Sequence, residues 1–209
     1  MPSLRSPIPS VLRAAGLFVV ALLLAAADHA DTDSLAGQLL IAAPTIGDAR
    51  FNHTVILVLR HDKDGAFGVV INRPIGERSI STLLEASGDS DPDAEGSVQV
   101  FAGGPVQPEL GFVVHDAEYR RAETLDVDGR IAMTASREVL RDIGHNHGPK
   151  DSLFALGYSG WGPGQLEGEM ARHDWFTTPG DPKLIFDDDR HNLWEDAMAR
   201  RTRELSSKC

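Results

Sequence analysis

The feature of this sequence that most constrains its fold is a pair of apolar runs separated by a short polar segment. Thr54 to Leu59 and Ala66 to Ile71 are rich in β-branched and leucyl residues and contain no charge. Runs of this length and composition are typical of strands buried on both faces of a sheet. The segment from His61 to Gly65 is polar and ends in glycine. The two runs therefore predict a β-hairpin with a five-residue loop.

Further strands and helices are predicted on both sides of this hairpin. Apolar stretches predict strands at residues 38–43, 98–101, 111–114, 130–134, 152–156 and 183–186. Apolar spacing and capping residues predict helices at 79–86, 136–143, 165–173 and 191–203. Pro74 is expected to stop strand pairing after the hairpin. This irregular alternation predicts an α/β fold of α+β character, a single domain whose mixed, largely antiparallel sheet has helices on both faces.

The first thirty residues differ from the rest of the chain. Arg5 and Arg13 precede an uncharged apolar run, Ala14 to Ala27, which ends in small residues suited to cleavage. The run is shorter than the roughly 20 apolar residues that a membrane-spanning helix needs. It predicts a signal peptide at 1–27, a short linker at 28–34, a domain at 35–203 and a disordered tail at 204–209. An uncleaved signal anchor and a mis-assigned start codon are the alternatives.

Compartment and charge limit the partners. A cleaved signal peptide places the protein in the periplasm or outside the cell, whereas a mis-assigned start would leave it cytoplasmic. The net charge of -11 disfavours nucleic acid, because nonspecific binding depends on Lys and Arg that neutralise phosphates. The single cysteine, Cys209, excludes an intramolecular disulfide and a thiolate zinc site. We expect a small-molecule or protein partner, and no stable membrane span after processing.

One motif suggests nucleophilic chemistry. The segment Gly157-Tyr158-Ser159-Gly160-Trp161 follows a predicted strand and precedes a predicted helix, where the G-x-S-x-G elbow of a hydrolase lies. Trp161 occupies the position of the last glycine of that motif. The available acid and base lie close together in sequence and give a weak signal: Asp187 or Asp188 with His191. A glycine-rich turn with packed aromatic rings is the favoured interpretation, and a serine hydrolase using Ser159 is the alternative.

Two histidines follow the helix predicted at 136–143. In an extended segment the side chains of His145 and His147 would point the same way, and with Asp142 or Asp151 they could hold a metal ion. A polar loop explains the same residues without a ligand. We therefore predict no cofactor and leave metal binding at these two histidines as an open alternative.

Three turns at strand ends supply the predicted ligand-binding residues. In Asn72-Arg73-Pro74 the arginine can hold an anion, or it can lock the turn by pairing with an internal acid. Gly103-Gly104-Pro105 can present backbone N–H groups. With the turn at 157–161, these segments are expected to meet on one rim of the sheet, where ligands of open α/β sheets bind. The predicted site comprises Asn72, Arg73, Gly103, Gly104, Tyr158, Ser159 and Trp161.

Five segments, in order and with their spacing, resemble the signatures of the YqgE/AlgH family (UPF0301): residues 35–51, 65–74, 103–106, 157–161 and 165–169. The resemblance covers about Leu35 to Ala199. It implies an α/β domain with a mixed sheet and implies no catalytic residues. The turn of the family commonly has alanine where Ser159 stands, which weakens the hydrolase alternative.

Some members of the family are named as transcriptional regulators, and this is a second alternative. The acidic charge and the predicted signal peptide disfavour it for this chain. The sequence therefore favours a non-enzymatic binding or interaction protein, and a regulatory role is compatible with this interpretation.

Overall fold

The computed structural model describes residues 34–187 and 190–207, with side chains up to residue 201. The predicted signal peptide, nearly all of the predicted linker and the last two residues lie outside this range. The described residues belong to one unit, which spans 31–209. None of the helices in it is long and apolar enough to cross a membrane.

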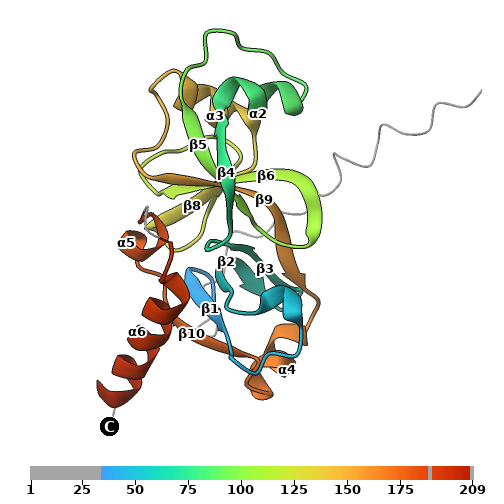
Figure 1. The fold of residues 1–209 in the computed structure, drawn as a ribbon, viewed down its shortest axis with the longest axis vertical. Coiled ribbons are helices and arrows are strands. Elements are labelled where there is room, and N and C mark those ends of the chain that lie inside the picture. Colours follow the sequence, from blue (N-terminus) through green and yellow to red (C-terminus); the bar gives the residue numbers. More distant parts are fainter. Residues whose placement is uncertain (1–33, 188–189, 208–209) are drawn as a thin grey trace, which may run out of the picture. The chain divides into compact units, whose positions relative to one another are not determined.

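Ten strands form a single branched sheet (Figure 1). Its main path runs β10-β1-β2-β3-β9-β6-β8-β7, and β5 pairs with β9 and carries β4 on its other side. Every pair is antiparallel except β5 with β9, which confirms the mixed, largely antiparallel sheet. The strands are β1 Gln38–Ala42, β2 Val55–Asp62, β3 Gly65–Val70, β4 Pro74–Ser79, β5 Ser97–Ala102, β6 Val106–Asp116, β7 Thr124–Asp126, β8 Ile131–Thr134, β9 Ser152–Trp161 and β10 Trp175–Pro179.

The predicted hairpin is confirmed as β2 and β3. The strands pair from Ile56 with Val70 to Asp62 with Gly65, with a shift of register between Val58 and Arg60. The connection is tighter than the sequence predicted, because the two strands extend into the polar segment. Every residue of β3 is buried, as expected for a strand in the middle of a sheet covered on both faces.

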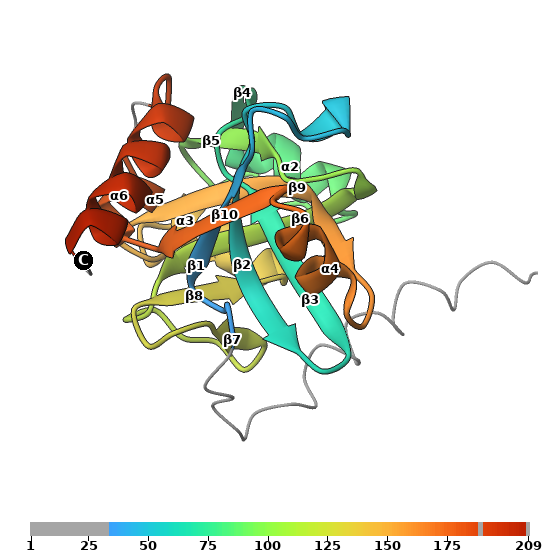
Figure 2. The ribbon, with the colours of Figure 1, turned by 90° about the horizontal axis from the view of Figure 1, so that it is seen from below.

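The helices are α2 Ile80–Ala86, α3 Arg137–Gly144, α4 Gln165–Ala171, α5 Pro182–Ile185 and α6 Leu193–Ser207, with a short 3-10 helix, η1, at Ala49–Phe51. Successive residues of β1 point to opposite faces of the sheet. Leu39 packs in one core cluster with Ile185 of α5 and Leu193 of α6. Leu40 packs in a second cluster with Leu166 of α4. Figure 2 shows α6 and α4 on different sides of the β1–β2–β3 region, so helices cover both faces as predicted.

A third core cluster lies under α2 and α3. These helices pack against each other and against one face of the β5–β9 region through Ile80, Leu84, Val100, Val139, Leu140 and Phe154. The side chain of Ser79 caps α2 by accepting from the amide of Thr82. Ser136, which the sequence suggested as a helix cap, stands at the N-cap position of α3 but makes no capping hydrogen bond with its side chain.

Apart from the turn predicted at 157–161, which is described below, three predictions of secondary structure were wrong. The segment 183–186 forms α5, because Asp181 accepts from the amide of Lys183 and Pro182 supplies a first helical residue. Pro74 begins β4 instead of stopping strand pairing; proline is tolerated there because β4 is an edge strand. Helix α6 continues to Ser207, into the segment predicted as a disordered tail. Strands β7 and β10 were not predicted.

Candidate functional site

Asn72 closes the end of the hairpin by bonding to the backbone. Its Oδ1 accepts from the amide of Val55 at 2.9 Å, and its Nδ2 donates to the carbonyl of His53 at 2.8 Å. Both functional atoms of the side chain are therefore occupied by the start of β2 and the loop before it. This residue holds the loop before β2 in place, and it also forms part of the wall of a cleft described below.

Arg73 locks the same loop. Its Nη2 donates to the carbonyl of Asn52 at 3.0 Å and to Oγ1 of Thr54 at 2.7 Å, and its Nη1 donates to the carbonyl of Arg50. The expectation that Arg73 locks a turn is thus supported, but the acceptors are carbonyl and hydroxyl oxygens instead of an internal acid. These contacts use both terminal nitrogens of the guanidinium group, which would otherwise be available to bind an anion.

Gly103 and Gly104 let two segments of backbone approach each other closely. The amide of Gly103 donates to the carbonyl of Leu156 at 2.7 Å, and its carbonyl accepts from Val70 at 2.8 Å. A Cβ atom on Gly104 would lie 2.1 Å from the carbonyl carbon of Tyr158. The amide of Gly103 is therefore committed to β9, and these glycines serve packing in this structure.

The segment 157–161 is the second half of β9, not the strand-to-helix turn that a nucleophile elbow requires. The reason is that Ser159 and Trp161 pair with Gly68 and Ala66 of β3. The side chain of Ser159 is buried, and its Oγ has no hydrogen-bond partner among the described residues. A serine nucleophile needs a base within hydrogen-bonding distance, so the geometry gives the hydrolase alternative no support.

The aromatic residues on either side of Ser159 pack inside the protein. The ring of Tyr158 lies 4.9 Å from the ring of Phe67, measured between centroids. Trp161 is 7% exposed and donates its indole N–H to Glu169 at 2.8 Å. The structure thus brings all three predicted turns together around β9, but it does so in a packed region. Ligand binding by these residues remains a prediction, and Asn72 is the residue of the set that lines the cleft.

The cleft lies over one face of β4, β5 and the start of β9 and has a volume of about 770 Å³. Three apolar side chains that belong to the main core, or pack against it, line it: Phe101, Leu153 and Phe186. Its polar lining residues are Asn72, Glu77, Gln99, Ser152, Asp187, Arg190 and His191. Volumes of roughly 300–1,000 Å³ are typical of ligand-binding clefts, in which a mainly apolar surface carries a few polar groups.

The strands position this lining by their period of two. Gln99 and Phe101 point to the same side of β5, and Glu77 of β4 lies opposite Gln99 in the pairing. The intervening residue Val100 points to the other side, where it packs under α2 and α3. One face of this part of the sheet is therefore closed by helices, and the other face opens into the cleft.

The cleft carries charges of both signs. Glu77 accepts from the hydroxyl of Ser97, and Asp187 is the second carboxylate in the lining. The guanidinium of Arg190 lies over the ring of Phe101, with its carbon 5.2 Å from the ring centroid. Such a contact is attractive because the face of an aromatic ring carries negative charge. It places a cation next to the apolar part of the cleft.

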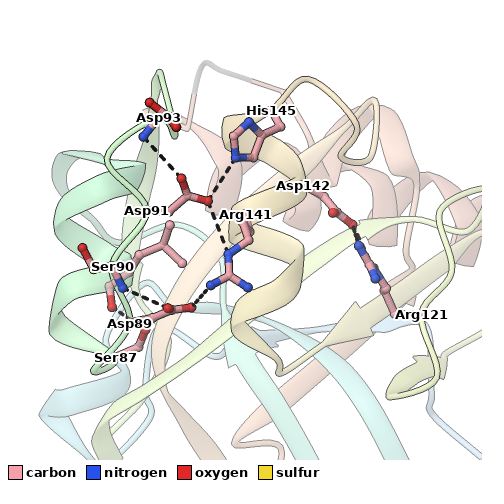
Figure 3. Close-up of polar contacts among 10 residues, drawn as sticks. Ser87, Asp89, Ser90, Asp91, Asp93, Arg121, Arg141, Asp142 and His145 are labelled. Carbon is pink, nitrogen blue, oxygen red and sulfur yellow. Dashed lines mark hydrogen bonds and ion pairs between the residues drawn. The ribbon is translucent and has the colours of Figure 1, made fainter.

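The end of α3 carries a separate network of ion pairs (Figure 3). Arg141 pairs with Asp89 at 2.6 Å and with Asp91 at 3.3 Å, and His145 bonds to Asp91 at 3.0 Å. The hydrogen bond from His145 lowers the pKa of the Asp91 carboxyl. These contacts tie the acidic loop at 87–96 to α3, so His145 acts here as an anchor of that loop.

Asp142, the carboxylate considered as a third metal ligand, is bound elsewhere. It accepts from Tyr119 at 2.5 Å and pairs with Arg121. Burial pushes the pKa of Asp142 upward, but the hydrogen bonds from Arg121 and Tyr119 outweigh it and lower the pKa. In residues 34–187 and 190–207 no three His, Cys, Asp or Glu side chains are placed to hold a metal ion. The geometry therefore does not support a metal site at His145 and His147.

A family model described as AlgH-like matches residues 39–206. This chain belongs to the AlgH-like family. A UPF0301 protein of Sphingopyxis alaskensis is 44% identical over 163 residues, which are 78% of this chain and 87% of that protein. A UPF0301 protein of Jannaschia sp. is 43% identical over 169 residues, or 80% and 88% of the two chains. The resemblance seen in the sequence motifs is thereby confirmed.

Solved structures agree with this assignment. The solution structure of AlgH from Pseudomonas aeruginosa has a TM-score of 0.71 at 34% identity, covering 88% of this chain and 98% of that one. A crystal structure of a Corynebacterium diphtheriae protein has a TM-score of 0.60 at 22% identity, covering 79% and 86%. The second likeness shows the fold alone. The names of these proteins specify no reaction, so the function is inferred from the geometry of the site.

Proposed function

We propose that this AlgH-like protein is a non-enzymatic interaction protein that binds a short segment of a partner protein in the cleft over β4, β5 and β9. The observation that carries the proposal is the form of the cleft: about 770 Å³, apolar at Phe101 and Leu153, polar around them and bordered by an edge strand. Apolar side chains of a ligand would contact the two buried residues. Its polar groups would meet Gln99 and Arg190.

The edge strand favours a peptide over a compact small molecule. In the described part of the chain, β4 pairs with β5 alone. A strand edge of this kind leaves backbone N–H and C=O groups that an extended peptide can pair with. Pro74 and the irregular register before Gly76 interrupt the first half of β4, so pairing is expected along its second half, next to Glu77. Alternate side chains of such a peptide would then lie over the cleft.

A peptide-display selection tests this proposal. Random dodecapeptides would be selected on the full-length protein, and the enriched peptides would be measured against two variants by fluorescence anisotropy. Gln99→Trp fills the cleft from an exposed position of β5, and Glu109→Trp makes a comparable change at an exposed position of β6 outside the lining. We expect at least about tenfold weaker binding to the first variant and unchanged binding to the second. Enriched peptides that bind both variants equally would refute the site.

We also propose that the protein acts after export, on the basis of the apolar run at 14–27 and its small C-terminal residues. Export separates the mature protein from DNA and so opposes the transcriptional-regulator alternative, leaving regulation through a protein partner. N-terminal sequencing of the protein isolated from its native cell tests this. An N-terminus near Asp28 is the expected result, and an intact N-terminus at Met1 or Pro2 would overturn it.

A further inference from the structure

A second pocket, independent of the cleft and of the function proposed for it, lies beside α4. Its volume is about 360 Å³, and it is formed where the loop after β1, helix η1 and the start of β10 meet α4. The residues that matter for its chemistry are two aromatic side chains, three carboxylates and one arginine: Phe51, Trp175, Asp48, Glu169, Asp174 and Arg172.

The aromatic residues of this pocket continue into the core as one group. The ring of Phe51 meets the ring of Trp175 edge to face, with centroids 5.5 Å apart. Trp175 in turn contacts Trp161 at 6.0 Å. Aromatic faces attract organic cations, most strongly when the cation is shielded from water. A pocket with such walls therefore favours a positively charged ligand that also has apolar surface.

Glu169 places a carboxylate in the wall between these rings. Its Oε2 accepts from the indole N–H groups of both Trp161 and Trp175 at 2.8 Å, and its Oε1 accepts from the amide of Gln165 at 2.9 Å. These bonds fix the carboxylate in one orientation. A carboxylate can accept about four hydrogen bonds, so one acceptor position is left for a ligand.

The other two carboxylates have cations of their own. Asp48 pairs with Arg50 at 2.6 Å, and Asp174 pairs with Arg172 at 3.0 Å. Glu169 forms no ion pair with any Lys, Arg or His among the residues that the structure describes. The local balance of charge at the pocket is therefore negative, and the charge without a counter-ion is the one held beside the aromatic rings.

We propose that this pocket binds an organic ammonium group, which lies mainly against Phe51, touches the small exposed part of Trp175 and is attracted by Glu169. A bare metal ion fits less well, because three N–H donors already point at the oxygens of Glu169. A compact ammonium group with alkyl substituents matches both features of the wall: its charge complements the carboxylate, and its alkyl surface covers the rings.

The test uses choline and its uncharged carbon analogue 3,3-dimethyl-1-butanol as probes on the full-length protein. Tryptophan fluorescence reports on the pocket once Trp194, which lies elsewhere and bonds to Ala42, is replaced by Phe. We expect choline to bind saturably and the neutral analogue to bind at least about tenfold more weakly. Equal binding of the two probes, or no saturable binding of choline, would overturn the proposal.

Variants locate the site. Glu169→Gln keeps an oxygen acceptor for the indoles and removes the charge, and we expect it to weaken choline binding about tenfold. Asp48→Asn leaves the buried contacts of Glu169 untouched and removes one negative charge from the pocket, so it should weaken binding even if Glu169→Gln folds poorly. Glu167→Gln, on the exposed side of the same helix, is the matched control and should bind like the parent. Choline affinity unchanged in both Glu169→Gln and Asp48→Asn would refute this location.

Discussion

Removing the carboxylate of Glu169 should destabilise the protein more than most substitutions of a partly exposed residue. Trp161 and Trp175 are 7% and 3% exposed, and both donate their indole N–H to the same oxygen of Glu169. In Glu169→Ala both donors lose their acceptor while the rings stay buried. A buried donor left without a partner costs about 1–3 kcal/mol. The two together predict a loss of about 2–6 kcal/mol in the free energy of unfolding.

Guanidinium chloride denaturation, followed by far-UV circular dichroism, measures this loss. The slope of the free energy of unfolding against denaturant is about 2–6 kcal/mol per molar for small proteins. A loss in the middle of the expected range would therefore lower the midpoint by roughly 1 M without changing the slope. Glu169→Gln retains an acceptor oxygen, so its loss should be smaller, about 1–2 kcal/mol. Glu167→Gln, on the same helix, controls for the general effect of substituting α4.

A double-mutant cycle isolates the hydrogen bond from the loss of packing. Trp161→Phe removes one donor together with its need for an acceptor. We expect Glu169→Ala to lower the free energy of unfolding by at least about 1 kcal/mol less in the Trp161→Phe background than in the parent. A cost of Glu169→Ala below about 0.5 kcal/mol, which is the usual effect of a surface substitution, or additivity of the two changes would contradict the role of these hydrogen bonds.

Three further outcomes follow from the packing of β9, the hairpin loop and a buried histidine. Gly104→Ala would place a Cβ 2.1 Å from backbone atoms, and it should lower the free energy of unfolding by more than about 3 kcal/mol in thermal or chemical unfolding. Gly162→Ala has open space around the new Cβ, so its free energy of unfolding should stay within about 1 kcal/mol of the parent's. Asn72→Ala removes the acceptor of the Val55 amide, so that amide should exchange faster with deuterium and stability should fall by about 1–3 kcal/mol; unchanged exchange would contradict the assigned lock. His115 is fully buried, and burial lowers its pKa below the ordinary value of 6.5. Because the pKa of His115 is higher in the unfolded chain, the unfolded chain takes up the proton at a higher pH than the folded protein does. The contribution of His115 to stability is therefore complete above about pH 6.5 and declines as the pH falls toward the pKa of the folded state. The difference in melting temperature between the parent and His115→Gln should narrow over that interval, and a constant difference would refute the assignment.

The hairpin was predictable because its signal is local. Two apolar runs around a polar turn specify pairing of neighbours in sequence, and β2 and β3 form as expected. The segment 183–186 shows the limit of this reasoning, since a short apolar run fits a buried strand and a buried helix equally well. Its helical state was indicated by Asp181 and Pro182, whose capping role outweighs the composition of the run.

The second half of β9 was misjudged for a different reason. Glycines at 157 and 160 suggested a turn, but both lie within the strand. Gly157 stands where another backbone segment approaches it, since a Cβ there would meet the carbonyl oxygen of Gly104 at 2.6 Å. The cleft shows the same limit. Asn72 was predicted as a site residue, but Gln99, Phe101 and Arg190 were not. Their proximity depends on strand pairing and on the position of the segment before α6, and a single sequence does not reveal either one.

The polar groups of the residues that carry the family resemblance mostly form hydrogen bonds within the protein. Asn72 and Arg73 bond to the loop before β2, Gly103 bonds to β9, and Glu169 binds two buried indoles. Such positions are constrained by the fold alone. Among the residues that line the cleft, Asn72 and Pro74 belong to one of the five motifs, whereas others, such as the exposed Gln99 of β5, lie outside them. Chains that share the motifs can therefore share this architecture and still differ in what they bind, and experiments on function gain more from substitutions in the cleft than from substitutions in the motifs.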